Sequence, residues 1–148
     1  MRRTRDPTEA WDELDAATRS RAKINVHIDA LCGVGDCGAT LDNDAALTIM
    51  ETGEVTRGRA AVAELLTYLH RSAFVAPPVV SALIAETDRV MIEAEFAGKH
   101  TGEFAGISPT GRMVRLPYAV AYDLGADSIS AVRLYLPLDA LVRQLRDT

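Results

Sequence analysis

The sequence contains few cysteines, and their spacing excludes the common cysteine-based sites. Cys32 and Cys37 flank the residues G-V-G-D, which is not the C-x-x-C spacing of redox and zinc motifs. His27 would add a third ligand, but no fourth ligand lies within reach in the sequence. We therefore expect free thiols, no bound metal and no cofactor.

The chain also lacks an excess of positive charge and any long apolar run. It has 16 lysines and arginines against 21 aspartates and glutamates, a net charge of −5. Nucleic-acid-binding domains usually present a basic face, so we expect no nucleic-acid partner. No apolar run approaches a membrane span or the core of a signal peptide. These features predict a cytoplasmic protein without a membrane partner.

The length of 148 residues predicts one domain, residues 1–148, with residues 1–10 flexible. Apolar residues at helical spacing predict three helices, and segments of alternating apolar residues predict the strands between them. The predicted helices cover about 8–31, 59–71 and 138–146, and the predicted strands cover 45–50, 79–85, 89–100, 113–124 and 129–136. Because no helix separates the later strands, we expect an α+β domain with helices on one face of a curved, mainly antiparallel sheet.

A glycine-rich stretch, "GKHTGEFAGISPTGR", follows the longest predicted strand. Gly106 and Gly111 match the outer spacing of a phosphate-binding P-loop, but Arg112 and Met113 replace its lysine and its hydroxyl residue. A strand also follows where a P-loop needs a helix N-terminus. We interpret the stretch as a long hairpin connection with turns at Pro109 and Gly111.

Polar residues with possible chemistry lie on the apolar faces of the two longest strands. Period two places His100 on the face of Val90, Ile92 and Phe96, and it places Tyr118 and Tyr122 on the matching face of the next strand. We expect both faces to turn toward the helices, so that His100, Tyr118 and Tyr122 share an apolar interior. A histidine and two phenols in such an interior suit acid/base chemistry, or else each is satisfied by local hydrogen bonds.

The second half resembles a known family. The motif "HTGEFAGISPTGRMVRLP", followed by a strand, a turn, a strand and a C-terminal helix, is similar to the SnoaL-like polyketide cyclases of the nuclear transport factor two-like superfamily, and "LDNDAALTIMETGEVTRGRAAV" supports the resemblance. It implies a cone-shaped fold, in which a curved mixed or antiparallel sheet packs on N-terminal helices and a C-terminal helix follows. It also implies an apolar pocket and a homodimer.

The sequence departs from the family at the residue that the resemblance makes catalytic. The family aspartate aligns with Val120, while Asp123 points to the opposite face, where we expect an ion pair with Arg133. We therefore expect His100 to act as the general acid or base and Tyr118 and Tyr122 to polarise an oxygen.

The predicted function is cyclisation, isomerisation or dehydration of a polyketide-like or other small hydrophobic molecule. We expect the residues that contact the substrate to be His27, Phe96, Val120 and Met50. Two alternatives remain: a non-catalytic binding or dimerisation module, which the valine at position 120 favours, and an epoxide hydrolase.

Overall fold

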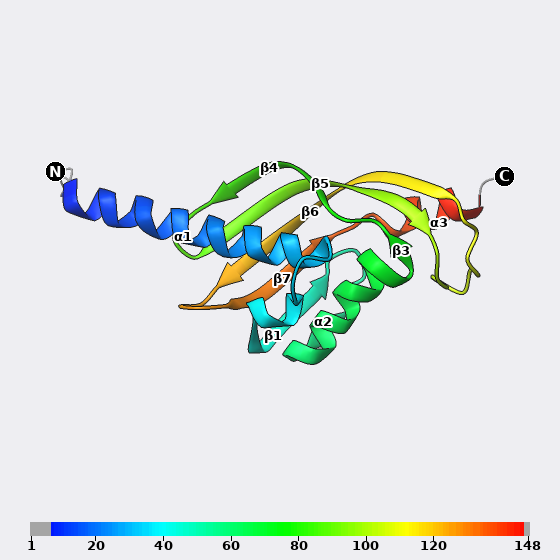
Figure 1. The fold of residues 1–148 in the computed structure, drawn as a ribbon, viewed down its shortest axis with the longest axis horizontal. Helices are drawn as coiled ribbons and strands as arrows, with labels where there is room; N and C mark the ends of the chain where they lie inside the picture. Colours follow the sequence, from blue (N-terminus) through cyan, green and yellow to red (C-terminus); the bar gives the residue numbers. More distant parts are fainter. Residues whose placement is uncertain (1–6, 147–148) are drawn as a thin grey trace.

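The structure, a computed structural model, describes the backbone of residues 7–146 and the side chains of residues 8 and 15–146. Of the segment expected to be flexible, residues 1–6 lie outside this range and residues 7–10 begin the first helix. The fold is an α+β cone in which a curved mixed sheet wraps one side of the helices (Figure 1). The predicted fold class is confirmed.

The helices form where the sequence has helical apolar spacing. Helix α1 (Pro7–Leu31) buries Ile24, His27, Ile28 and Leu31, which lie three or four residues apart on one face. Helix α2 (Arg59–Thr67) buries Val62 and Leu66 and passes directly into a π-helical turn, η2 (Tyr68–Ser72). Helix α3 (Leu138–Arg146) ends the described chain, and a short 3-10 turn, η1 (Cys37–Thr40), follows α1.

The sheet has seven strands, and six of them lie in the order β2-β1-β7-β6-β5-β3, with β4 pairing to β5. Neighbouring strands are antiparallel except β1 and β7, which are parallel. The strands are β1 (Leu41–Ile49), β2 (Val55–Arg57), β3 (Phe74–Val75), β4 (Val79–Ala85), β5 (Arg89–His100), β6 (Met113–Leu124) and β7 (Ile129–Tyr135). The sequence predicted β4, β5 and β6 at these bounds, but it missed β2 and β3 and placed the start of β1 too late.

Strands β5 and β6 carry the core because their side chains alternate strictly between two faces. Residues 90, 92, 94, 96, 98 and 100 of β5 are buried, and so are residues 114, 116, 118, 120 and 122 of β6. The inner face packs toward α1 and α2, and the outer face is more exposed. On the outer face Arg133 donates to both carboxylate oxygens of Asp123, at 2.9 and 3.0 Å, which confirms the predicted ion pair.

The glycine-rich stretch is a hairpin connection, as predicted, but its tight turn lies at Ala105 and Gly106 and not at Pro109 and Gly111. Residues 101–112 join β5 to β6, and His100 and Arg112 are still paired at its base through a backbone hydrogen bond of 2.9 Å. Within it, Phe104 and Ile107 form an isolated bridge around Ala105 and Gly106. Position 102 requires glycine, because the Cβ of any other residue there would lie 2.6 Å from the Ser72 carbonyl oxygen.

Candidate functional site

The chain has three histidines, and all three are buried. The exposed fractions are 0% for His27, 3% for His70 and 0% for His100. Apart from Ser20 these are the buried polar residues of the part of the chain that the structure describes, so no carboxylate is among them. The buried titratable side chains of the described residues are therefore three imidazoles, the phenols of Tyr118 and Tyr122, and the thiol of Cys37.

His70 and Tyr118 form a hydrogen-bonded pair in the interior. Nδ1 of His70 lies 3.0 Å from the Leu66 carbonyl oxygen, which only accepts, so Nδ1 carries the proton. Nε2 of His70 then accepts from the Tyr118 hydroxyl at 3.2 Å. The turn η2 sets this geometry, because Ala73 N–H bonds to the Tyr68 carbonyl across a wide turn and leaves the His70 ring facing the sheet.

His70 is not among the site residues predicted from the sequence, although it lies within the helix predicted over residues 59–71. His70 follows Val62 and Leu66 at intervals of four, so helical spacing already places it on the buried stripe. That spacing was the available signal.

Burial keeps this pair neutral. It lowers the pKa of His70 to about 4, although the Leu66 carbonyl raises that pKa in part. Burial also raises the pKa of Tyr118 well above its ordinary value, and the nearby Tyr122 adds to the shift. At pH 7 Nε2 of His70 thus has a lone pair and Tyr118 keeps its proton.

His27 presents a second imidazole lone pair to the interior. The Thr40 hydroxyl donates to the Cys37 carbonyl at 2.8 Å, so it accepts from Nδ1–H of His27 at 2.7 Å. Nε2 is then the unprotonated nitrogen, and it is buried without a hydrogen-bond partner among the described residues. Burial, and then the proximity of His70, lower the pKa of His27 to about 4.

Two of the predicted site residues join these histidines. The ring of Tyr122 meets the ring of His27 edge-on, with 5.5 Å between centroids, and burial raises its pKa. Phe96 contacts both His70 and Tyr118, at centroid distances of 5.6 and 5.7 Å. The structure therefore brings together His27, His70, Phe96, Tyr118 and Tyr122, and we call these five residues the imidazole–phenol cluster.

His100 does not join this cluster. Tyr118 pairs with Ala94 on β5, and His100 lies six residues further along that strand, about 20 Å away at strand spacing. Its Nδ1 accepts from Thr110 N–H at 3.1 Å and lies 2.9 Å from the Thr110 hydroxyl. These bonds hold the glycine-rich connection against β5, while Nε2 lies unpartnered near Phe74.

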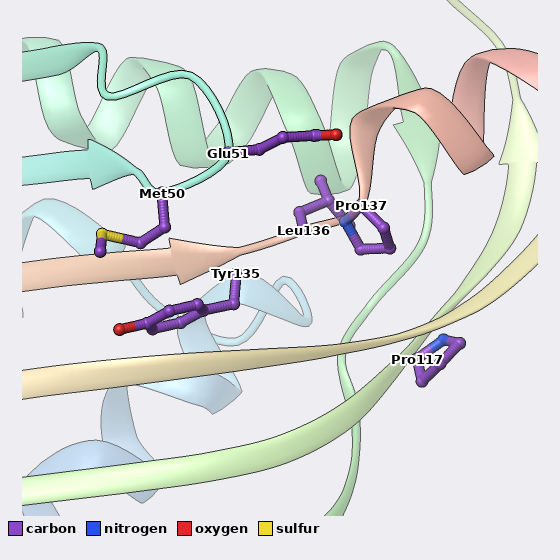
Figure 2. A pocket seen from close by; sticks show the side chains of 6 residues that line it. All are labelled: Met50, Glu51, Pro117, Tyr135, Leu136 and Pro137. Carbon is purple, nitrogen blue, oxygen red and sulfur yellow. The ribbon is translucent and has the colours of Figure 1, made fainter.

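The other two predicted contact residues lie on different faces. Val120 sits between Tyr118 and Tyr122 on the inner face and is 5% exposed. Met50 follows β1 and lines a groove of about 550 Å³ with Glu51, Pro117, Tyr135, Leu136 and Pro137 (Figure 2). Pro117 and Tyr118 are neighbours in β6 and face opposite ways, so this groove is on the outer side of the sheet.

A cavity of about 290 Å³ opens onto the cluster at His70. Its lining comes from the end of α1 and the next residue, from η2, and from β3 and the loop that follows it, namely Leu31, Cys32, His70, Arg71, Val75 and Pro77. Tyr118 is 5% exposed and hydrogen-bonded to His70. A ligand in this cavity would therefore meet His70 first and Tyr118 behind it.

Neither a metal site nor a disulfide forms around the cysteines. Cys32 is exposed, Cys37 is buried, and both are free thiols. Within residues 7–146, as far as their side chains are described, no group of three histidine, cysteine, aspartate or glutamate residues is placed to hold a metal. The described helices include none that is long and apolar enough to cross a membrane.

Comparisons with known proteins agree on one family. The model of the family described as SnoaL-like polyketide cyclase matches residues 31–145. No functionally curated protein sequence matches the chain.

Several solved structures share the fold. A protein assigned as a polyketide cyclase from Xanthomonas campestris superposes with a TM-score of 0.75 at 24% identity, over 88% of this chain and 98% of that one. A protein assigned as a SnoaL-like polyketide cyclase from Jannaschia gives 0.80 at 18% identity, over 99% of both chains. A protein assigned as a hydroxylase from Streptomyces galilaeus gives 0.73 at 18%, over 87% and 96%.

Proposed function

Because the chain belongs to the SnoaL-like polyketide cyclase family, we propose that it is an enzyme that cyclises, isomerises or dehydrates a small hydrophobic, polyketide-like molecule. The observation that carries this proposal is the buried hydrogen bond between Nε2 of His70 and the Tyr118 hydroxyl, next to a cavity. A neutral base and a neutral acid in contact, away from bulk water, are what proton transfer to and from carbon or oxygen requires.

We assign the two groups opposite roles. Tyr118 donates a hydrogen bond and, because its proton is held firmly, it stabilises charge that develops on a substrate oxygen. When Tyr118 turns to the substrate, Nε2 of His70 is released to accept a proton. Leu66 holds the other nitrogen of the ring, which fixes the tautomer that has this lone pair.

His27 and Tyr122 extend the site. The free Nε2 of His27 is a buried acceptor that a substrate hydroxyl would satisfy, because a buried polar atom without a partner costs about 1–3 kcal/mol. Tyr122 packs on that ring and would hold a second oxygen. Phe96 and Val120 supply the apolar walls.

The experiment is a turnover assay on a panel of linear and cyclic polyketide-like compounds, read by chromatography and mass spectrometry. His70→Gln and Tyr118→Phe should each lower turnover by about a hundredfold or more, the usual range for a lost acid or base. His100→Gln is the matched control, because His100 is also a buried histidine and is the one that the sequence analysis predicted to be catalytic. If His100→Gln loses turnover and His70→Gln does not, His100 is the general acid or base and the proposed role of His70 is wrong.

The alternative functions differ in product. If compounds bind but return unchanged from the wild type, the protein is a binding module, as the valine at position 120 favours. A product that has gained water as a diol would identify an epoxide hydrolase. Folding of each variant is checked by its thermal unfolding curve.

We further propose that the protein is a homodimer joined through the outer face of the sheet. Apolar side chains are exposed there, with exposed fractions of 69% for Ile84, 44% for Met91 and 41% for Tyr135. Two grooves, of about 550 and 370 Å³, meet at Tyr135 on this face. A second copy would cover these apolar groups, which water otherwise contacts.

A further inference from the structure

The cavity beside His70 carries a single charged group. Its other lining residues are the apolar Leu31, Val75 and Pro77, the thiol of Cys32 and the neutral His70. Arg71 follows His70 in the turn η2; His70 is buried, whereas Arg71 is exposed and its guanidinium lies near Gly33 at the outer end of the cavity. The entrance is therefore cationic and the interior is neutral.

Arg71 has no protein partner for its charge among residues 15–146. None of their ion pairs or hydrogen bonds includes its side chain. The guanidinium lies over Gly33, 3.7 Å from the position that a Cβ would take there. An arginine that is not used by the protein can offer its donors to a bound anion.

No acidic side chain competes for this position. No aspartate or glutamate lines the cavity. The Asp36 carboxylate accepts from Gly38 N–H at 2.9 Å. Burial, and then the nearby Asp29 carboxylate, raise the pKa of the Cys32 thiol, but Asp29 forms no ion pair with Arg71. Arg71 is therefore the charged group that a ligand in this cavity meets.

We infer that the ligand of this cavity is an aromatic or alicyclic carboxylate, with its anionic group on Arg71 and its ring body directed toward His70 and Tyr118. The inference rests on the proposed use of this cavity as the binding site. A volume of about 290 Å³ is at the lower end for ligand pockets, so it suits one or two rings. The carboxylate cannot point inward, because the buried cluster holds no cation to pair with it.

The test compares acids with their neutral amides. Benzoate and benzamide, 1-naphthoate and 1-naphthamide, and 2-naphthoate and 2-naphthamide are titrated by calorimetry into the wild type, Arg71→Gln, Arg71→Lys and Arg143→Gln. Arg143 is an exposed arginine on α3 that does not line the cavity, so its variant controls for net charge. Each titration is repeated at higher salt.

For the wild type and Arg143→Gln, at least one acid should bind about fivefold more tightly than its amide, which is the strength of an exposed ion pair. Arg71→Gln should remove this preference, Arg71→Lys should retain part of it, and salt should weaken it in the wild type. The inference is overturned if amides bind as tightly as acids, if Arg71→Gln keeps the preference, or if no acid binds.

This result is separable from the proposed function. A charge preference that depends on Arg71, together with turnover that is indifferent to His70→Gln, would refute the catalytic proposal and keep the carboxylate site. If turnover requires His70 but acids and amides bind equally well, the catalytic proposal is kept and the carboxylate site is refuted.

Discussion

The three histidines of this chain are equally buried but have different hydrogen-bond partners, and those partners determine what each ring can do. His27 and His70 donate through Nδ1 to protein oxygens, so the Nε2 lone pair of each ring faces the interior. His100 accepts at Nδ1 from Thr110 N–H, so its proton is on Nε2. The first two rings can accept a proton or a hydrogen bond from a ligand, whereas the third holds a loop to a strand.

The buried neutral histidines should make the protein sensitive to mild acid. The unfolded chain binds protons near the ordinary histidine pKa of 6.5, whereas folded His27 and His70 bind them only near 4. Stability from neutral burial is therefore complete above about pH 6.5 and is lost as the pH falls toward 4. Between pH 7 and pH 5 each ring should cost about 2 kcal/mol of unfolding free energy.

Urea unfolding of the wild type and His70→Gln at pH 7 and pH 5 measures this effect. The variant should lose about 2 kcal/mol less than the wild type over that interval, whatever its stability at pH 7. An equal loss in both proteins would show that His70 is not held neutral by the fold.

At the scale of elements, the sequence predicted the regular parts and missed the irregular ones. Strict alternation in β5 and β6 predicted both strands to the residue, and it correctly put Tyr118 and Tyr122 on the inner face. The strands β2 and β3 have only three and two residues, too few for a period to be seen. Their pairing depends on neighbours that are distant in the sequence.

The site was only partly predictable for the same reason. Alternation predicted that His100 faces inward, but alternation does not give the distance between His100 on β5 and Tyr118 on β6. That distance is set by the strand register, in which Tyr118 pairs with Ala94. Helical spacing places His70 on the buried side, but its hydrogen bond to Tyr118 depends on the turn η2, whose wide geometry that spacing does not reveal. Side-chain periodicity thus identified the correct face, and the register selected the residues that meet on it.

At the scale of the whole molecule, the fold separates two surfaces of different composition. The inner face and the helices enclose the imidazole–phenol cluster, and the outer face of the sheet carries exposed apolar residues. If a second copy covers the outer face, sedimentation should give about twice the chain mass of 16.0 kDa. Met91→Glu should shift the protein to monomer, because it would bury a charge in the interface.

Val34→Glu is the control for that experiment. Val34 is 71% exposed and lies in the turn after α1, away from the sheet. The Val34→Glu variant should therefore remain a dimer. A wild type that sediments at the mass of one chain would refute the dimer, and dissociation by both variants would show that the outer face is not the interface.

The most direct test of the central claim is NMR of the imidazole nitrogens during titration with the acid that binds most tightly in the calorimetric test, and with its amide. With three histidines in the sequence, each ring can be assigned by substitution. We predict that His27 and His70 are neutral, with the proton on Nδ1, at pH 6, and that ligand moves the Nε2 signals of these two rings and leaves His100 unchanged. Ligand shifts confined to His100, or none at His70, would contradict the account and move the site to the other end of the sheet.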